Sequence, residues 1–260
     1  MHLILWLFLA CSTRSEIPPV HSSPATLGWR LLPGQELTYK MHTQLDREDE
    51  TFVREEHWTY LVEAVDTDGI AHLTGKLSAF GLTKINPSES LKAIHTEGVE
   101  KSEKARLAKE TVQIQLSTEG RLVRLDGLGF HDSLPHRLLA LQLPVGAISP
   151  GENWANPALA RPYANLLPAE SVVSVEGTET YKGLHHYRGD IQALIESHGE
   201  VTATTEQGSS SILLHGSTWW DPDPGVLAWR ALEGALVQSD NAKTGQIRIQ
   251  IELLDGSQTH

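Results

Sequence analysis

The feature that most constrains the fold is the alternation of apolar and polar residues in short segments separated by turns. It is cleanest in segments 112–116 (VQIQL) and 121–125 (RLVRL), which flank the turn 117–120 (STEG). A period of two places successive side chains on opposite faces of a strand. The apolar residues of these segments would face a core and the polar ones solvent. This predicts a half-buried antiparallel hairpin.

The same pattern recurs along most of the chain, so the sequence predicts a mainly β fold. The closing segment QIRIQIELL alternates strictly. We expect an antiparallel curved sheet, arranged as an open barrel or a sandwich, with one or two short helices. The further predicted strands are 35–45, 57–65, 70–80, 171–176, 179–182, 184–194, 201–206, 210–220, 226–237 and 246–254.

One segment, 131–143 (HDSLPHRLLALQL), predicts a short helix because its leucines share one face. Asp132 or Ser133 can cap its start, and Pro135 fits its first turn. A loop dense in Pro and Gly, 143–154, follows this helix.

Two features leave alternatives open. The mixed-charge run 97–110 reads equally well as a solvated helix or as an exposed strand pair. Segments 120–127 (GRLVRLDG) and 225–234 (GVLAWRALEG) resemble one another in pattern. The β-rich domain, which we expect over 27–256, is therefore either one unit or two similar halves that meet near residue 150.

Charge and composition exclude some classes of protein. The chain of 260 residues carries 33 acidic and 21 basic residues, so its net charge is −12. A general nucleic-acid binder needs a basic surface that displaces counterions, so we expect no nucleic-acid partner. No segment approaches the roughly 18 consecutive apolar residues of a membrane-spanning helix. A domain of this length can fold without a metal or a disulfide.

The only cysteine, Cys11, directly follows the apolar run Leu3–Ala10. A run of this length matches the apolar core of an export signal. Placed after a small residue, the cysteine resembles the lipobox of bacterial lipoproteins, in which its sulfur receives a diacylglyceryl group and it becomes the new N-terminus. The residues that follow are rich in Ser and Pro, as in a tether. We predict a signal peptide at 1–10 and a lipidated Cys11 with its tether at 11–26.

This anchor would set the location of the protein. Ser12 rather than Asp follows the cysteine, which in the sorting pattern of such lipoproteins implies the outer membrane. We expect a bacterial cell-envelope protein, anchored to the membrane by its acyl chains and facing the periplasm or the cell surface. No Lys or Arg precedes the apolar run. An ordinary export signal, or an apolar first strand with a chance cysteine, therefore stays an alternative.

No pattern of catalytic or metal-binding residues occurs in the sequence. His185 and His186 would lie on opposite faces of a strand and could not hold one ion without a bulge. The segment HGST at 215–218 lacks the strand–turn–helix context of a nucleophile elbow. The tripeptide RGD at 188–190 is a chance match. We expect no enzyme activity, no catalytic or metal site and no cofactor.

Adjacent tryptophans give the one hint of an apolar ligand. Trp219 and Trp220 fall on a predicted strand, so one would face the core and the other would face outward. The outward one would be covered or would line a groove, since apolar pockets favour aromatic walls. Which residues would contact a ligand is not indicated by the sequence.

Together with Cys11, the loop LP…PGENW at 143–154 and the turn DPDPG at 221–225 make the chain resemble a poorly characterised group of bacterial envelope lipoproteins. Members of this group have a lipobox, a tether and a β-rich domain. The resemblance implies an envelope location and no reaction. We therefore expect a non-enzymatic protein that binds a lipid, another apolar ligand or a protein partner. The alternatives are a secreted hydrolase with a non-standard site and a purely structural protein.

Overall fold

The computed structural model describes residues 23–47, 50–85, 93–167, 172–206, 208–238 and 243–255. The predicted signal peptide, Cys11 and most of the predicted tether lie outside these residues. Among the helices that are described, none is long and apolar enough to cross a membrane.

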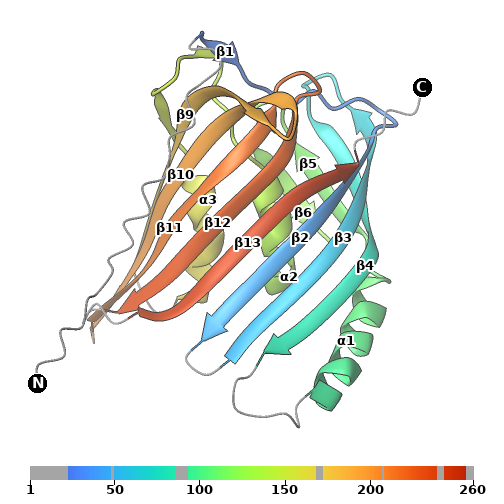
Figure 1. Cartoon of the computed structure of the whole chain (residues 1–260), viewed down its shortest axis with the longest axis vertical. Coiled ribbons are helices and arrows are strands. Elements are labelled where there is room, and N and C mark those ends of the chain that lie inside the picture. Colours follow the sequence, from blue (N-terminus) through green and yellow to red (C-terminus); the bar gives the residue numbers. More distant parts are fainter. Residues whose placement is uncertain are drawn as a thin grey trace, which may run out of the picture.

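One antiparallel sheet of eleven strands forms the body of the protein (Figure 1). The strand order is β6-β5-β4-β3-β2-β13-β12-β11-β10-β9-β8. Because the described edge strands β6 and β8 are not paired with each other, the curved sheet stays open. The strands are β2 (Glu36–Arg47), β3 (Glu50–Val65), β4 (Ala71–Ile85), β5 (Val112–Leu116), β6 (Leu122–Asp126), β8 (Asn153–Ala155), β9 (Val172–Tyr187), β10 (Asp190–Thr205), β11 (Gly208–Asp221), β12 (Val226–Gln238) and β13 (Lys243–Asp255). A separate pair joins β1 (Ala25–Thr26) to β7 (Ala147–Ile148).

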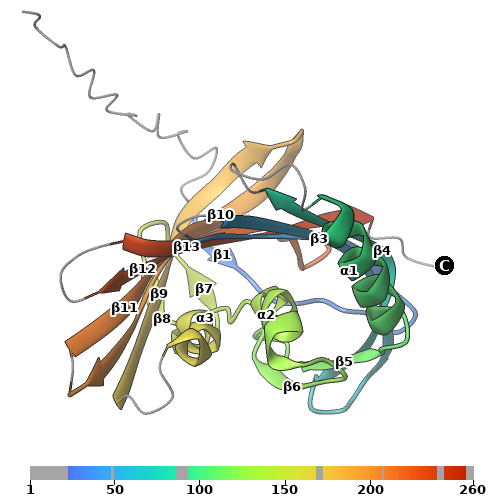
Figure 2. The same ribbon diagram turned by 90° about the horizontal axis from the view of Figure 1, so that it is seen from below.

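Short helices lie inside the curve of this sheet. Figure 2 shows α2 (Phe130–Leu139) and α3 (Pro157–Ala160) on the concave side. The 3-10 helix η1 (Arg161–Leu166) continues α3 and contacts β9 and β10. The longer helix α1 (Ala93–Leu107) packs beside β4. The described residues thus contain three α-helices. The mixed-charge run 97–110 falls on α1, the helical one of its two alternatives, and α3 is a helix that the sequence did not indicate.

Most predicted strands fall on observed ones, but several boundaries are wrong. The strands predicted over 171–176 and 179–182 both fall on β9. Segment 112–116 forms β5. The helix predicted over 131–143 forms α2, but it ends at Leu139, and its N-cap is Gly129 and neither Asp132 nor Ser133.

The single strand predicted over 184–194 is wrong, because β9 turns into β10 at Arg188 and Gly189. Their φ angles are 54° and 101°. Two successive residues with positive φ are typical of a tight two-residue hairpin. The RGD tripeptide is therefore part of this turn.

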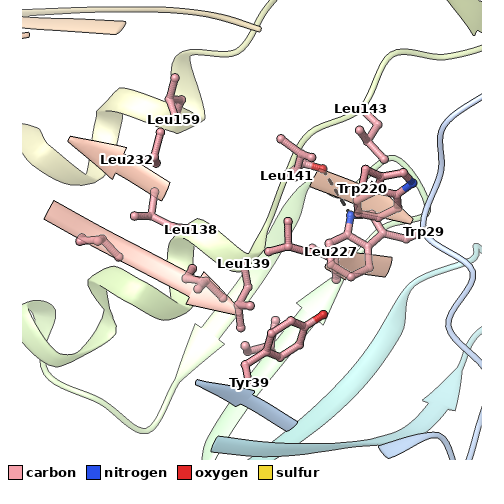
Figure 3. Close-up of a cluster of buried hydrophobic side chains, with 14 of the residues drawn as sticks. Trp29, Tyr39, Leu138, Leu139, Leu141, Leu143, Leu159, Trp220, Leu227 and Leu232 are labelled. Carbon is pink, nitrogen blue, oxygen red and sulfur yellow. Dashed lines mark hydrogen bonds between the residues drawn. The ribbon is translucent and has the colours of Figure 1, made fainter. Parts of the chain in front are cut away.

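The main core lies between the concave face and α2 with the segment that follows it. Figure 3 shows Leu141 close to Trp29 and Trp220, and Leu138 close to Leu232. The indole N–H of Trp29 donates to the Leu141 carbonyl at 3.3 Å, and its ring meets Trp220 edge-on at 4.7 Å. These contacts fix the chain that leads into β2 against the centre of the core.

The two adjacent tryptophans divide as predicted. Trp220 is fully buried on the concave side. Trp219 lies on the other face, where the ring of Tyr187 stacks on it at 4.4 Å. Trp219 is 9% exposed, so the outward tryptophan is a covered one.

Candidate functional site: the concave face of the sheet

The concave face is built by alternation along strands in register. Leu37 and Tyr39 of β2 lie opposite Tyr60 and Trp58 of β3, and all four side chains are buried. Because alternate residues share a face, the same side of the sheet is apolar along each strand. A sheet with such a face needs a cover, which helices supply here.

Buried polar side chains interrupt this apolar face near its middle. The first group, here called the Glu179 cluster, contains Glu179 (β9), Ser197 (β10), Arg230 (β12) and Asn156, which precedes α3. The Arg230 guanidinium lies 3.0 Å from the Glu179 carboxylate and donates to the Leu138 carbonyl of α2 at 3.2 Å. Ser197 and the Asn156 amide also donate to Glu179. The cluster thus joins the strands β9, β10 and β12 to the helices α2 and α3.

Burial controls the electrostatics of this cluster. Glu179 has no exposed surface and Arg230 is 2% exposed. Burial raises the pKa of the Glu179 carboxyl, and Arg230 and the two neutral donors offset this only in part. Both partners are therefore needed in the folded protein, because removing either one would leave the charge of the other buried and unpaired.

The second group, here called the Asp132 cluster, joins the other end of α2 to the sheet. It contains Arg54 and Glu56 (β3), Asp132 (α2) and Arg106 (α1). Arg54 lies 2.6 Å and Arg106 2.7 Å from the Asp132 carboxylate. Burial raises the pKa of Asp132, but the bonds from both arginines outweigh it, and the pKa falls below its usual value. The pKa of Glu56 is raised, because burial outweighs the effect of Arg54.

A third polar contact holds the middle of α2. The Tyr60 hydroxyl lies 2.5 Å from Nδ1 of His136, whose ring meets Trp58 edge-on at 4.8 Å. His136 is fully buried, and burial lowers its pKa to about 3. The imidazole is therefore neutral at pH 7 and shares a hydrogen bond with the Tyr60 hydroxyl. Helix α2 is thus bound to the sheet by polar contacts at Asp132, His136 and Leu138.

The space under α2 is almost filled. A cavity of about 20 Å³ remains between the sheet and the end of α2. A space of this size holds roughly one water molecule. Its lining is Trp29, Leu37, Tyr39, Tyr60, Leu73, Ile114, Leu116, Leu139 and Ala140. An apolar ligand larger than a water therefore needs either a movement of α2 or another part of the concave face.

The histidines singled out in the sequence do not converge. His185 is buried and His186 is exposed, on opposite faces as predicted. His198 and His215 pair across β10 and β11. Within the described ranges, no group of three His, Cys, Asp or Glu side chains is placed to hold a metal ion. The HGST segment lies inside β11.

The residues that bind the helices to the sheet were missed by sequence reasoning. Glu179 and Arg230 occur at what look like ordinary polar positions, and Asp132 was expected only to cap the helix. Their partners are far away in the chain: Arg230 is 92 residues from Leu138 and 51 from Glu179. Only the strand register brings them together, so no local motif could have indicated them.

Comparisons with known proteins show a similar fold in solved structures. No family model and no curated protein matches the sequence. A structure of lipovitellin that concerns its lipid–protein interactions matches with a TM-score of 0.51 and 11% identity. The match covers 88% of this chain and 26% of the lipovitellin chain, so this chain spans about a quarter of that protein.

Two further matches have lower scores. The hypothetical lipoprotein YmcC from Escherichia coli matches with a TM-score of 0.28 and 10% identity, over 87% of this chain and 90% of its own. A DUF1329 family protein from Desulfovibrio piger matches with a TM-score of 0.15 and 9% identity, over 86% and 88%. At 11% identity, the lipovitellin match shows a similar fold and no more.

Proposed function

We propose that the protein is a non-enzymatic lipoprotein of the bacterial cell envelope that binds a lipid on the concave face of its sheet. The observation that carries the proposal is a large apolar sheet face covered by short helices instead of a second sheet. Contacts between a helix and a sheet face can change without breaking the hydrogen bonds of the strand ladder. Such a face can accept hydrocarbon while the sheet stays intact.

Two further observations support this proposal. The lipovitellin structure with a similar fold concerns lipid–protein interactions. In addition, the buried carboxyl of Glu179 and the half-buried carboxyl of Asp132 are each paired with arginine, so neither is a free acid or base. These features favour a binding role over catalysis.

Lipid uptake can be tested directly. We expect native mass spectrometry of the protein, extracted gently from its host membrane, to show adducts with the mass of a lipid. The purified protein should also take up palmitic acid bearing a fluorophore. A ligand-free mass together with no uptake above that of an unrelated acidic β protein would refute lipid binding.

The anchor needs a separate test. Cells that express the full chain would be labelled with palmitate, beside cells that express Cys11→Ser. We expect label and membrane association in the first case, and the loss of both in the second. Ser12→Ala is the matched control and should retain the label. Label on the Cys11→Ser protein, or a soluble wild-type protein, would contradict the proposed anchor.

A further inference from the structure

On the outer, convex face of the sheet, the turn between β9 and β10 folds over two tryptophans. The ring of Tyr187, the last residue of β9, stacks on Trp219 of β11 at 4.4 Å with 12° between the ring planes. Arg188 in the turn forms an ion pair with Glu252 of β13, across β11 and β12 in the sheet. Trp229 of β12 is the cross-strand partner of Trp219, and its ring lies 6.5 Å from that of Tyr187. The turn, at the top of Figure 1, therefore covers an aromatic surface.

Two buried polar side chains beside this surface have hydrogen-bonding atoms without a partner. His185 is 2% exposed and Gln192 6% exposed, and the two pair directly across β9 and β10. The His185 ring meets Trp219 edge-on at 6.0 Å, so both side chains lie on the outer face next to the indole. Within the part of the chain that the structure describes, neither Nδ1 of His185 nor Oε1 of Gln192 has a hydrogen-bond partner. Because buried polar atoms are nearly always paired, these two atoms point to a ligand.

Both of the unpartnered atoms are acceptors. Nε2 of His185 lies 3.3 Å from the Lys182 carbonyl oxygen, which can only accept, so Nε2 carries the proton. In the neutral imidazole, Nδ1 is then an acceptor, as is the amide oxygen of Gln192. The site therefore asks for a ligand that donates two hydrogen bonds next to an indole ring.

Carboxylates near the turn add to this acceptor character. Asp190 is the cross-strand partner of Tyr187. Burial raises the pKa of Asp221, at the end of β11, and the nearby charges of Asp223 and Asp190 raise it further. These carboxylates would repel a phosphate or a fatty-acid carboxylate, and an acyl chain or a quaternary ammonium has no proton to donate. A pyranose sugar meets both demands, because its hydroxyls donate while its C–H groups pack on the negative face of an aromatic ring.

We propose that the outer face at Trp219 binds a sugar, whose pyranose ring takes the place that Tyr187 occupies in the closed turn. Hydroxyls of the sugar would donate to Nδ1 of His185 and Oε1 of Gln192. Two features ease the opening of the turn. The Arg188 side chain is 56% exposed in its pair with Glu252, and such exposed pairs are weak. Its φ angle of 54° also favours glycine over arginine. This site lies on the opposite face from the proposed lipid site and is independent of it.

A glycan array probed with the purified full chain tests the class of ligand. The array would display glucose, galactose, mannose and their N-acetylamino forms as terminal residues. Isothermal titration calorimetry would then measure the affinity for the sugar that binds best. We expect at least one sugar to bind and to change the tryptophan fluorescence, because it stacks on Trp219. A chain that binds no glycan on the array overturns the proposal, as does a chain that binds choline and no sugar.

Variants test the two parts of the site separately. Gln192→Met removes one acceptor, so we expect the affinity for the sugar to fall about three- to tenfold. Gln113→Met is the matched control in the other half of the sheet, where Gln113 is exposed on β5, and should change the affinity less than about twofold. Tyr187→Ala removes the ring that competes for Trp219, so the affinity should rise at least about threefold. Equal affinities of the two glutamine variants, or weaker binding by Tyr187→Ala, would overturn the proposal.

Discussion

Replacing Arg230 by methionine tests whether the Glu179 cluster holds α2 against the sheet. Methionine keeps the unbranched apolar stem and loses the guanidinium. That group donates to the Leu138 carbonyl at 3.2 Å and lies 3.0 Å from the Glu179 carboxylate. The variant therefore removes one contact to the helix and one contact to the neighbouring strands.

The expected loss of stability follows from burial. Breaking a buried ion pair by removing one partner costs about 3–5 kcal/mol, because the remaining charge is buried and unpaired. Glu179 still accepts hydrogen bonds from Ser197 and Asn156, which limits this cost. The lost bond to the α2 carbonyl adds to it. We expect the free energy of unfolding to fall by about 4 kcal/mol at pH 7.

The double variant Glu179→Gln with Arg230→Met isolates the unpaired charge. With a neutral amide in place of the carboxylate, no buried charge is left, and we expect a loss of only about 1–2 kcal/mol. The double variant should therefore be more stable than Arg230→Met alone. Such recovery is the signature of a charge pair, because two independent packing defects would add.

The pH gives a second signature. Burial already raises the pKa of Glu179 above 4.5, and removing Arg230 raises it further. Between 4.5 and this raised value, the folded variant holds a proton that the unfolded chain lacks, so its relative stability falls as pH rises. The difference from wild type should therefore shrink as pH is lowered through the raised pKa of the variant, by at most about 1.4 kcal/mol per pH unit while Glu179 is protonated in the folded variant and ionised in folded wild type.

Urea unfolding followed by tryptophan fluorescence at pH 5, 6 and 7 measures these differences. Groups common to wild type and variant cancel in the comparison. The reasoning is refuted if the penalty is the same at pH 5 and pH 7, or if the double variant is no more stable than the single one.

Two other predictions concern α2 and α3. Because burial lowers the pKa of His136 from 6.5 to about 3, its contribution to stability is complete above pH 6.5 and is lost as pH falls toward 3, by up to about 5 kcal/mol. In urea unfolding between pH 4 and 7, His136→Phe should be less pH-dependent than wild type, and parallel curves would contradict this. Gly177→Ala would place a Cβ 2.2 Å from the Asn156 carbonyl oxygen and should lower the free energy of unfolding by about 1–3 kcal/mol. Gly81→Ala, with nothing within 4 Å of its Cβ, is the control and should change it by less than about 0.5 kcal/mol; equal effects would refute the close approach of α3.

The sequence predicted the sheet where one face is apolar, and failed where polar residues face inward. The predicted strand at 57–65 is the second part of β3, which begins at Glu50. The missed part contains Arg54 and Glu56, whose side chains bind α2 and Trp58 from the concave face. Two charged residues at inward positions break the alternation on which the prediction depends.

The same reason explains why the site was not found. The lipobox that we predict at Cys11 depends only on a local pattern, whereas this site does not. The contacts of α2 depend on register between distant strands and on burial, and neither is encoded locally. The turn at Arg188 was missed although it is local, because arginine is not a typical residue for a positive φ angle. Leucine spacing alone was sufficient to locate α2.

The position of β13 has a consequence for folding. This strand comes last along the described chain but lies in the middle of the sheet, between β12 and β2. Met41 of β2 pairs with Ile251 of β13. This pairing joins strands β2 to β6 with strands β8 to β13, and it closes nearly the whole described chain into a loop. Until β13 docks, β2 exposes an unpaired edge that can associate with other chains. The complete sheet can therefore assemble only after residues 243–255 have been synthesised. A chain that stops before them would leave two separate sheets, each with an unpaired edge strand that can associate with other chains.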